Sequence, residues 1–387
     1  MSSLPQHHET VERSGELGAL ARLFLRLGTI AFGGPAAHIA MMEDEIVRRR
    51  QWLTHDDFLD MISACNLIPG PNSTEMAIHI GQRRAGFAGL AVAGACFIVP
   101  AALITMALAW GYVAFGRMPQ VAGILYGVKP VIIAVVVHAI WRLARSVLRT
   151  RLLIALTIAA TVAAFAGIDE MVILFAAGAF VIVARRVRGE FGAAFAASGA
   201  AGAVKVGVVA AVPFTLGALF LFFLKIGAIL FGSGYVLLAF LQADLVDRMH
   251  WLTQSQLLDA VAIGQITPGP VSSTATFIGY VLGGTRGAVI ATVGIFLPAF
   301  FFVSISGPLL PRLRRSPLAG AFLDGVNAGS FALMVTVTWQ LGRAALVDPT
   351  TLVLAAASSL LLLRFQLNSA WLILLGAVVG GIATFTH

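Results

Sequence analysis

The sequence Pro-Gly-Pro occurs twice inside apolar segments, at residues 69–71 and 268–270, and small polar side chains follow both copies. Proline removes a backbone donor and glycine adopts dihedral angles that other residues avoid, so each copy is expected to interrupt a helix. A helix that restarts there directs its unpaired N–H groups and the positive end of its dipole at the break, which favours an anion. The predicted members of this anion site are Gly70, Asn72, Ser73, Thr74, Gly269, Ser272, Ser273 and Thr274. The alternative is that Asn72, Ser273 and Thr274 only cap the restarted helices.

Two cations lie at matching positions within apolar runs, each ahead of a glycine-rich break. Arg26 precedes Gly33-Gly34, and Lys225 precedes Gly232-Ser233. A charge near the centre of a bilayer costs roughly 3 kcal/mol or more on insertion scales, so such residues are usually functional. We predict that both cations and the four residues of these breaks bind an anion with two negative charges. The alternative for Arg26 is that its side chain reaches the lipid headgroups.

Titratable and amide side chains lie beside these breaks. Glu75 follows the first Pro-Gly-Pro with His79 one turn later, and His38 follows Gly33-Gly34. Intramembrane carboxylates and histidines often relay protons, so Glu75 and His38 are predicted to couple protons to the anion, although Glu75 could instead pair with a neighbouring arginine. Asn66 and Gln265 each precede a Pro-Gly-Pro by three residues and are predicted to donate hydrogen bonds at the break.

Other chemistries find no support in the sequence. There is no nucleotide-binding loop, metal cluster or hydrolytic triad, so we expect no catalytic residues, no metal and no cofactor. Cys65 and Cys96 match no metal spacing, and we do not expect a disulfide. The net charge of +8 is attributed to cytoplasmic lysines and arginines rather than to nucleic-acid binding.

These candidate residues lie in two related halves of the chain. Residues 24–34 (FLRLGTIAFGG) return as residues 223–233 (FLKIGAILFGS), and Trp52 returns as Trp251, both at an offset of 199. The offset becomes 198 further on, where Gly89 matches Gly287 and Trp141 matches Trp339. Paired interrupted segments in the two halves of an apolar chain are typical of secondary transporters.

The composition predicts a multi-pass membrane protein. Of the 387 residues, 59% are hydrophobic and 11% are charged, and the mean hydropathy is +0.91. We predict an all-α integral membrane protein with broken or re-entrant helices. The expected parts are a cytoplasmic tail (1–19), a first repeat (20–188), a linker or extra crossing (189–212) and a second repeat (213–387).

Charge gives the expected orientation. Arginines at 48–50 and 83–84 flank the first Pro-Gly-Pro, and both clusters favour the cytoplasm, so the segment between them should enter the membrane and turn back. The second half is less decisive, because arginine counts are similar for a parallel and an inverted repeat. We favour inversion, since the apolar segment 189–212 can supply the odd crossing.

Five motifs together resemble the chromate ion transporter family, two-domain type. The resemblance extends from about residue 20 to residue 384. The motifs are residues 32–39 (FGGPAAHI), 67–75 (LIPGPNSTE), 231–235 (FGSGY), 264–271 (GQITPGPV) and 295–298 (IFLP).

This resemblance implies a carrier in the cell inner membrane that exports chromate and confers chromate resistance, driven by the proton motive force as an antiporter. It implies two fused halves of opposite orientation and sulfate as a related substrate or competitor. A sulfate or general oxyanion carrier and a passive anion channel remain alternatives, whereas an enzyme is not expected. A monomer and a homodimer are both compatible with the sequence.

Overall fold

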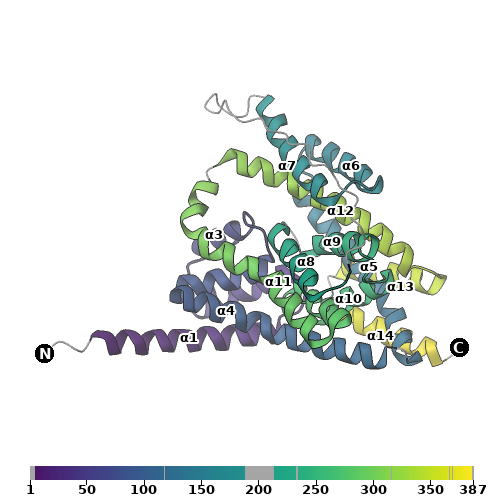
Figure 1. The fold of residues 1–387 in the computed structure, drawn as a ribbon, viewed down its shortest axis with the longest axis horizontal. Coiled ribbons are helices and arrows are strands. Elements are labelled where there is room, and N and C mark those ends of the chain that lie inside the picture. The colour runs from purple at the N-terminus through teal and green to yellow at the C-terminus, as the bar shows by residue number, and fades with distance from the viewer. Residues whose placement is uncertain are drawn as a thin grey trace.

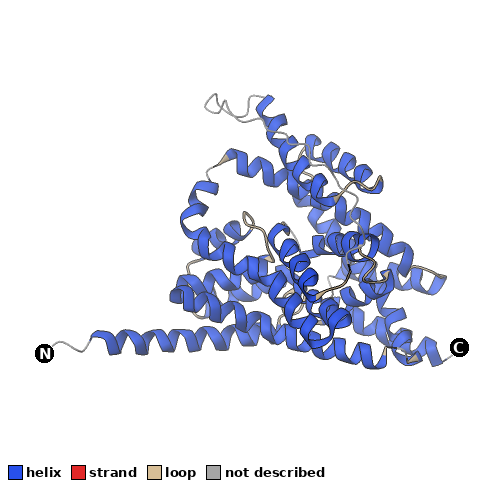
Figure 2. Cartoon of the chain, viewed as in Figure 1, coloured by secondary structure: helices blue, strands red, loops and turns tan. Residues whose placement is uncertain are grey.

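The computed structural model describes residues 5–116, 118–187, 213–231, 234–314, 316–365, 367 and 369–385. Within these ranges the chain forms helices joined by loops, and no strand occurs there (Figure 2). The prediction of an all-α protein is thereby confirmed. The proposed linker 189–212 and the candidate residues Gly232 and Ser233 lie outside the described residues.

The first repeat begins with a helix that extends well beyond the apolar segment predicted from residue 20. Helix α1 starts at Pro5, so the described part of the predicted tail continues directly into that segment. The elements of this repeat are α1 (Pro5–Ile30), α2 (Gly34–Glu43), the π-helix η1 (Asp44–Arg49), α3 (His55–Cys65), α4 (Asn72–Phe115), α5 (Pro119–Val147), α6 (Arg151–Phe165) and α7 (Glu170–Val187).

The second repeat follows the same order, with short 3-10 segments at its breaks. Its elements are α8 (Leu216–Ile229), η2 (Gly234–Val236), α9 (Leu237–Phe240), the π-helix η3 (Leu241–Arg248), α10 (Gln254–Ile266), η4 (Val271–Ser273), α11 (Thr274–Arg314), α12 (Pro317–Ala345), α13 (Pro349–Phe365) and α14 (Ser369–Phe385). The residue before each of the two equivalent tryptophans, Trp52 and Trp251, has a positive φ, of 52° at Gln51 and 53° at His250. The two repeats therefore share even an unusual backbone conformation at equivalent residues.

Helix α4 consists of two arms that fold back on one another. Its regular geometry is interrupted at Ala85 (φ −139°) and Gly86 (φ +59°). A Cβ at Gly81, in the first arm, would overlap the backbone oxygen of Gly89 in the second, so the arms touch through glycine. Helix α11 repeats this turn at Gly283 and Gly284, with φ −142° and +60°.

The two arms make the Pro-Gly-Pro segment re-entrant in form. Helix α3 leads to the break, the first arm of α4 (residues 72–84) leads away from it, and Arg83 near the end of that arm binds Asp57 in the first turn of α3 at 2.7 Å. Both ends of the segment therefore lie together, while the break lies at the far end of both helices.

The repeats are packed through one another rather than side by side. Helix α1 packs along α4, and α8 along α11, within their own repeats, whereas the hairpin of α6 and α7 packs on α12 and that of α13 and α14 packs on α5 (Figure 1). Small residues permit the close crossings: a Cβ at Gly127 of α5 would overlap the backbone of Gly376 and Gly380 in α14. Each repeat thus contributes a surface that the other repeat covers.

Four helical segments in the described ranges are long and apolar enough to cross a membrane, namely Asn72–Phe115, Gln120–Val147, Val271–Ser306 and Pro317–Ala345. Shorter apolar helices accompany them at Arg151–Phe165, Leu216–Ile229, Pro349–Phe365 and Ser369–Ile382. Large apolar side chains are exposed along these helices, among them Trp110, Phe301 and Trp371, as expected of a surface that faces lipid.

Candidate functional site

At the first break, a hydrogen bond between two polar side chains joins the end of α3 to the start of α4. Helix α3 ends at Cys65, and the Asn72 side-chain amide at the start of α4 donates to the Asn66 side-chain oxygen at 2.8 Å. Gly70 lies between them with φ +146°, a conformation that favours glycine. Asn66, which was predicted to donate at the break, here accepts a hydrogen bond from Asn72 across it.

The second break has the same backbone plan. Helix α10 ends at Ile266, Gly269 has φ +87°, and the 3-10 turn η4 leads into α11 at Thr274. The Thr274 hydroxyl donates to the carbonyl of Val271 at 2.8 Å, a local side-chain-to-backbone bond of a kind that threonine often makes. The Thr274 hydroxyl, one of the predicted anion donors, therefore already donates its proton to a nearby backbone carbonyl.

The two breaks meet the opposite repeat through reciprocal backbone hydrogen bonds. The amide of Gly70 donates to the carbonyl of Leu230, at the end of α8, at 2.8 Å. The amide of Gly269 donates to the carbonyl of Ala31, just after α1, also at 2.8 Å. An exchange of equivalent contacts is the signature of a pseudo-two-fold relation, so the breaks lie at the contact between the two repeats.

Several polar side chains at the two breaks are buried without a hydrogen-bond partner in the described part of the chain. Thr74 and Glu75 are 0% exposed, and Ser272 and Ser273 are each 1% exposed. Most buried polar atoms in proteins are paired, because an unpaired one costs about 1–3 kcal/mol. The unpartnered atoms are Thr74 Oγ1, both carboxyl oxygens of Glu75, Gln265 Nε2, Ser272 Oγ, Ser273 Oγ and His38 Nδ1.

His38 is joined to the second break through one carbonyl. Gly33 and Gly34 have φ +105° and +77° and start α2, which brings the His38 ring Nε2 to 3.1 Å from the carbonyl of Ala31. That carbonyl also accepts from Gly269. The glycine pair and His38 therefore lie beside the second Pro-Gly-Pro, a contact between the two repeats that the sequence analysis did not predict.

Glu75 lies against the first break. A Cβ at Gly70 would overlap Oε1 of Glu75, so its carboxyl group is in contact with the glycine whose amide joins the repeats. Ser73 is also buried, at 2% exposed, at the start of the same arm. The predicted proton-coupling carboxyl and the predicted anion donors Ser73 and Thr74 thus lie buried at the same break.

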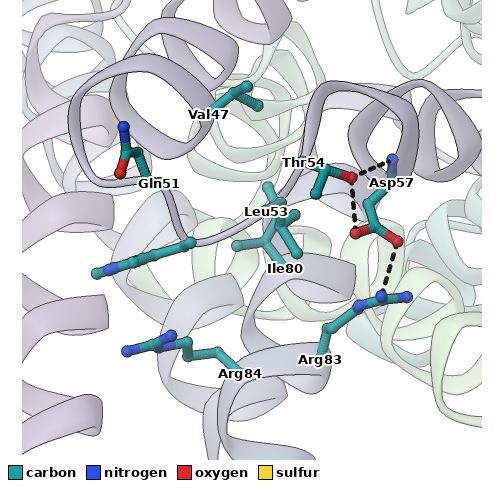
Figure 3. A pocket seen from close by; sticks show the side chains of 9 residues that line it. Val47, Gln51, Leu53, Thr54, Asp57, Ile80, Arg83 and Arg84 are labelled. Atoms are coloured by element: carbon teal, nitrogen blue, oxygen red, sulfur yellow. Dashed lines mark hydrogen bonds and ion pairs between the residues drawn. The ribbon is translucent and has the colours of Figure 1, made fainter.

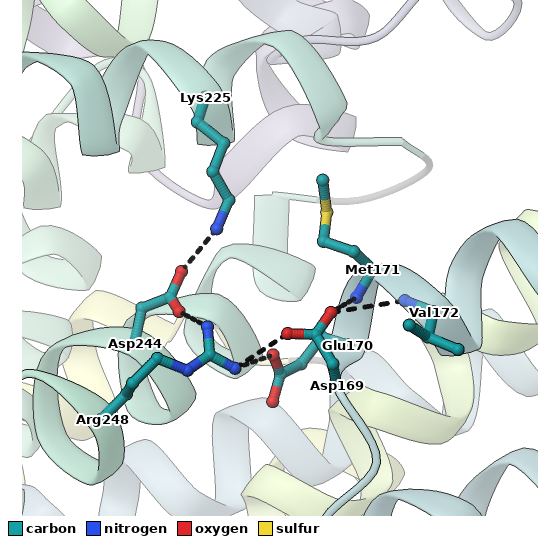
Figure 4. Close-up of polar contacts among 7 residues, drawn as sticks. All are labelled: Asp169, Glu170, Met171, Val172, Lys225, Asp244 and Arg248. Atoms are coloured by element: carbon teal, nitrogen blue, oxygen red, sulfur yellow. Dashed lines mark hydrogen bonds and ion pairs between the residues drawn. The ribbon is translucent and has the colours of Figure 1, made fainter. Parts of the chain in front are cut away.

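The two predicted anion-binding cations are bound to carboxylates in this structure. Arg26 Nη1 lies 3.2 Å from Glu45 Oε1, and Lys225 Nζ lies 3.0 Å from Asp244 Oδ2 (Figure 4). Both acids are 19 residues after their cation, so the pair itself is repeated. An arginine one turn after each acid, Arg49 or Arg248, joins the same carboxylate.

The cluster in the second repeat extends into the first. Arg248 also binds Asp169 Oδ2 at 2.9 Å and Glu170 Oε2 at 3.5 Å, at the start of α7 (Figure 4). Asp244 is 1% exposed and serves two cations, whereas the Lys225 side chain is 39% exposed. These cations therefore hold elements together in this conformation, and the sequence signal for their partners was the shared spacing of 19 residues.

Two further polar contacts and two buried polar side chains were not assigned to the site from the sequence. Asp259 in α10 accepts from Tyr112 of α4 at 2.9 Å and lies 3.1 Å from Lys129 Nζ of α5. His79 Nε2 and Thr105 Oγ1 are buried without a partner in the described ranges. The Asp259 contacts cross from repeat to repeat, which no local spacing could indicate.

A cavity of about 540 Å³ opens where the first arm of α4 ends (Figure 3). Arg83 and Arg84 line it together with Asp57, and the Trp52 ring lies 5.0 Å below the guanidinium carbon of both Arg50 and Arg84. Arg84 also binds Glu16 of α1 at 3.3 Å. The cavity lies beside the two ends of the re-entrant segment rather than at its break.

Two interlocked helical repeats, each interrupted at a buried polar break that contacts the other repeat, define a membrane transport protein of the two-repeat class. The profile of the chromate transporter family matches residues 18–183 and 217–381, one match for each repeat. The chain belongs to this family.

Relatives of nearly full length agree with this assignment. The chain is 32% identical to the chromate transport protein of Cupriavidus metallidurans over 377 residues, covering 95% of this chain and 93% of the relative. It is 31% identical to the probable chromate transport protein of Synechococcus elongatus, covering 94% and 95%. It is 34% identical to the chromate transport protein of Pseudomonas aeruginosa over 334 residues, covering 83% and 80%. No solved structure gives a significant match.

Proposed function

We propose that this protein exports chromate across the cell inner membrane and couples export to proton entry. The observation that carries the proposal is the group of buried, unpartnered hydroxyls and amide at two helix starts, where the repeats meet. Two helix N-termini supply partial positive charge there, which suits a dianion. Family membership and the names of the relatives support chromate as that dianion.

The anion is held, in this proposal, by Thr74, Ser272, Ser273 and Gln265, with the backbone donors that follow Gly70 and Gly269. Desolvating a dianion is expensive, so many donors must converge on it. Arg26 and Lys225 reach the anion only by leaving Glu45 and Asp244, and we propose that this exchange of partners belongs to the transport cycle.

Inverted repeats are part of the proposal, and contacts between the repeats support them. The two ends of the first re-entrant segment lie together where the second arm of α4 begins, since Arg83 binds Asp57 there. Tyr112, near the other end of that arm, binds Asp259 near the start of the second re-entrant segment. Residues 87–115 are about 40 Å long at 1.5 Å per residue, enough to cross a bilayer, which supports the proposal that the two segments open on opposite faces.

Coupling follows from the contact of Glu75 with the first break. When Glu75 loses its proton, its negative charge competes with the carbonyl of Leu230 for the amide of Gly70. When Glu75 is protonated, that competition ends and the bond between the repeats is favoured. The protonation state of one carboxyl group therefore biases the contact about which the repeats would rock.

The test is uptake of radiolabelled chromate into inside-out membrane vesicles with an imposed proton gradient and with sulfate as competitor. Proton-coupled export predicts saturable uptake that requires the gradient. Flux that neither saturates nor responds to the gradient would replace the proposal by a passive channel. Uptake of labelled sulfate without uptake of chromate would make the protein a sulfate carrier.

A further inference from the structure

The first arm of α4 carries titratable side chains from the buried break to the cavity at its end. Glu75 is 0% exposed, His79 is 8% exposed, and Arg83 lines the cavity. The three residues are spaced by four, so they lie on nearly one face of the helix, with about 6 Å of rise between neighbours. Nε2 of His79 has no hydrogen-bond partner in the described chain, and neither has either carboxyl oxygen of Glu75.

The corresponding arm of α11 has no such series. The turns at Gly86 and Gly284, and the glycine contacts at Gly81 and Gly279, align the two arms at an offset of 198. At this offset Phe277 takes the place of His79 and Val281 that of Arg83. The two arms therefore share a backbone course and differ in side chains. The series of titratable side chains occurs only in the arm of the first repeat.

We propose that His79 transfers protons between the Glu75 carboxyl group and the water-accessible cavity at the end of the first arm of α4. This inference rests on the proposed function, in which Glu75 couples protons to anion export. Glu75 gives its proton to one ring nitrogen of neutral His79, the other ring nitrogen releases a proton to water in the cavity, and the imidazole returns to its neutral form. No oxidant or further reactant is consumed.

The charges at the cavity favour release rather than storage of the proton. Arg83 and Arg84 lie at the end of the same arm, and their positive charges disfavour the imidazolium form of His79 one turn away. Their partners Asp57 and Glu16 can accept hydrogen bonds from water in the cavity. Between cavity and break, His79 is the titratable side chain of this arm. Titratable side chains on the elements packed against the arm include Glu16, Arg22 and Arg26 of α1, His38 and Glu43 of α2, His55, Asp56, Asp57, Asp60 and Cys65 of α3, and Tyr280 and Arg286 of α11.

The first half of the experiment separates proton-driven from proton-independent transport in His79→Gln. Gradient-driven chromate uptake into inside-out vesicles and chromate–chromate exchange without a gradient are measured on the same preparation. Loss of a positioned proton carrier reduces the gradient-driven rate by about 100-fold, while exchange stays within about twofold of wild type. His138→Gln is the matched control, since His138 lies in α5 and should leave both rates unchanged.

The second half asks for chemical rescue. In His79→Ala, added imidazole should restore part of the gradient-driven rate, which a purely structural role would not allow. An unchanged gradient-driven rate in His79→Gln overturns the relay, and so does an equal loss of both rates, which would assign His79 to anion binding or folding. Wild-type uptake that ignores the gradient refutes proton coupling itself, and the relay with it.

Discussion

The backbone amide of Gly70 donates to the carbonyl of Leu230 at 2.8 Å, and Gly269 makes the equivalent bond to Ala31 at the same distance. Leu230 and Ala31 follow the last turns of α8 and α1, where carbonyls lack partners within the helix. Each Pro-Gly-Pro break thus completes the end of a helix from the other repeat. Any movement of one repeat against the other must either preserve these two hydrogen bonds, with the breaks as pivots, or break them.

Gly70→Ala should abolish chromate uptake and lower the stability of the protein. The new methyl group would overlap Glu75 Oε1, and φ +146° is strained for alanine, which costs about 1–3 kcal/mol in unfolding free energy. Gly86→Ala is the control, because its φ of +59° is also positive but no atom lies within 4 Å of the added Cβ. Detergent thermal unfolding and vesicle uptake measure both effects, and equal losses of transport in the two variants would contradict the special role of the break.

Asp244→Ala should destabilise the protein more than Lys225→Ala. Asp244 is buried between Lys225 and Arg248, and removing one member of a buried ion cluster costs about 3–5 kcal/mol. Lys225→Ala leaves Asp244 with Arg248, and the lysine is partly exposed, so its loss should cost much less. Denaturant unfolding of the two single variants and the double variant tests the order. A larger loss for Lys225→Ala would show that the lysine has another buried partner.

Tyr112→Phe should weaken the contact between the repeats by about 1.5–3 kcal/mol, because its hydroxyl donates to the buried carboxylate of Asp259. Tyr126→Phe is a matched control, since that hydroxyl donates at 2.6 Å to Asp348 in the loop before α13. The shift in unfolding midpoint should be clearly smaller for the control. A similar shift in both variants would mean that burial of Asp259 adds nothing to the bond.

Thr74→Val should raise the KM for chromate about tenfold or more, since a hydrogen bond to a charged group contributes about 1.5–3 kcal/mol. Thr74→Ser retains the hydroxyl and should stay near the wild-type value. Thr274→Val is the comparison, because the Thr274 hydroxyl already donates to Val271 and is not available to the anion in this conformation. Saturation curves of vesicle uptake distinguish the three, and a KM for Thr74→Val equal to wild type would remove Thr74 from the anion site.

Cysteines introduced at Asp56 and Ser255 should be labelled from opposite sides of the membrane. Both positions are exposed, and they are equivalent in the two repeats at the offset of 199. With Cys65 and Cys96 replaced, a membrane-impermeant thiol reagent added to right-side-out and to inside-out vesicles reads the side directly. Labelling of both cysteines from one side would establish parallel repeats and contradict the inverted orientation that we propose from the contact between Tyr112 and Asp259.

Much of the fold follows from local sequence. Apolar runs predict the long helices, and Pro-Gly-Pro predicts breaks before α4 and η4, because proline and glycine act through the backbone of their own residue. The re-entrant course of residues 55–84 also follows locally, since the arginines at both ends favour the same side of the membrane.

The sequence by itself determined the two repeats, the apolar helices and the residues at the breaks, because these depend on composition, periodicity and the backbone chemistry of single residues. Only the tertiary structure decided which groups are partners. It pairs Arg26 with Glu45 and Lys225 with Asp244, and it joins Lys129 and Tyr112 to Asp259. Within the described part of the chain it leaves the Thr74 and Ser273 hydroxyls and the Glu75 carboxyl oxygens without a partner. A partner is chosen by distance after helices from different parts of the chain have packed, and the interlocking of the two repeats is the step that local sequence does not encode.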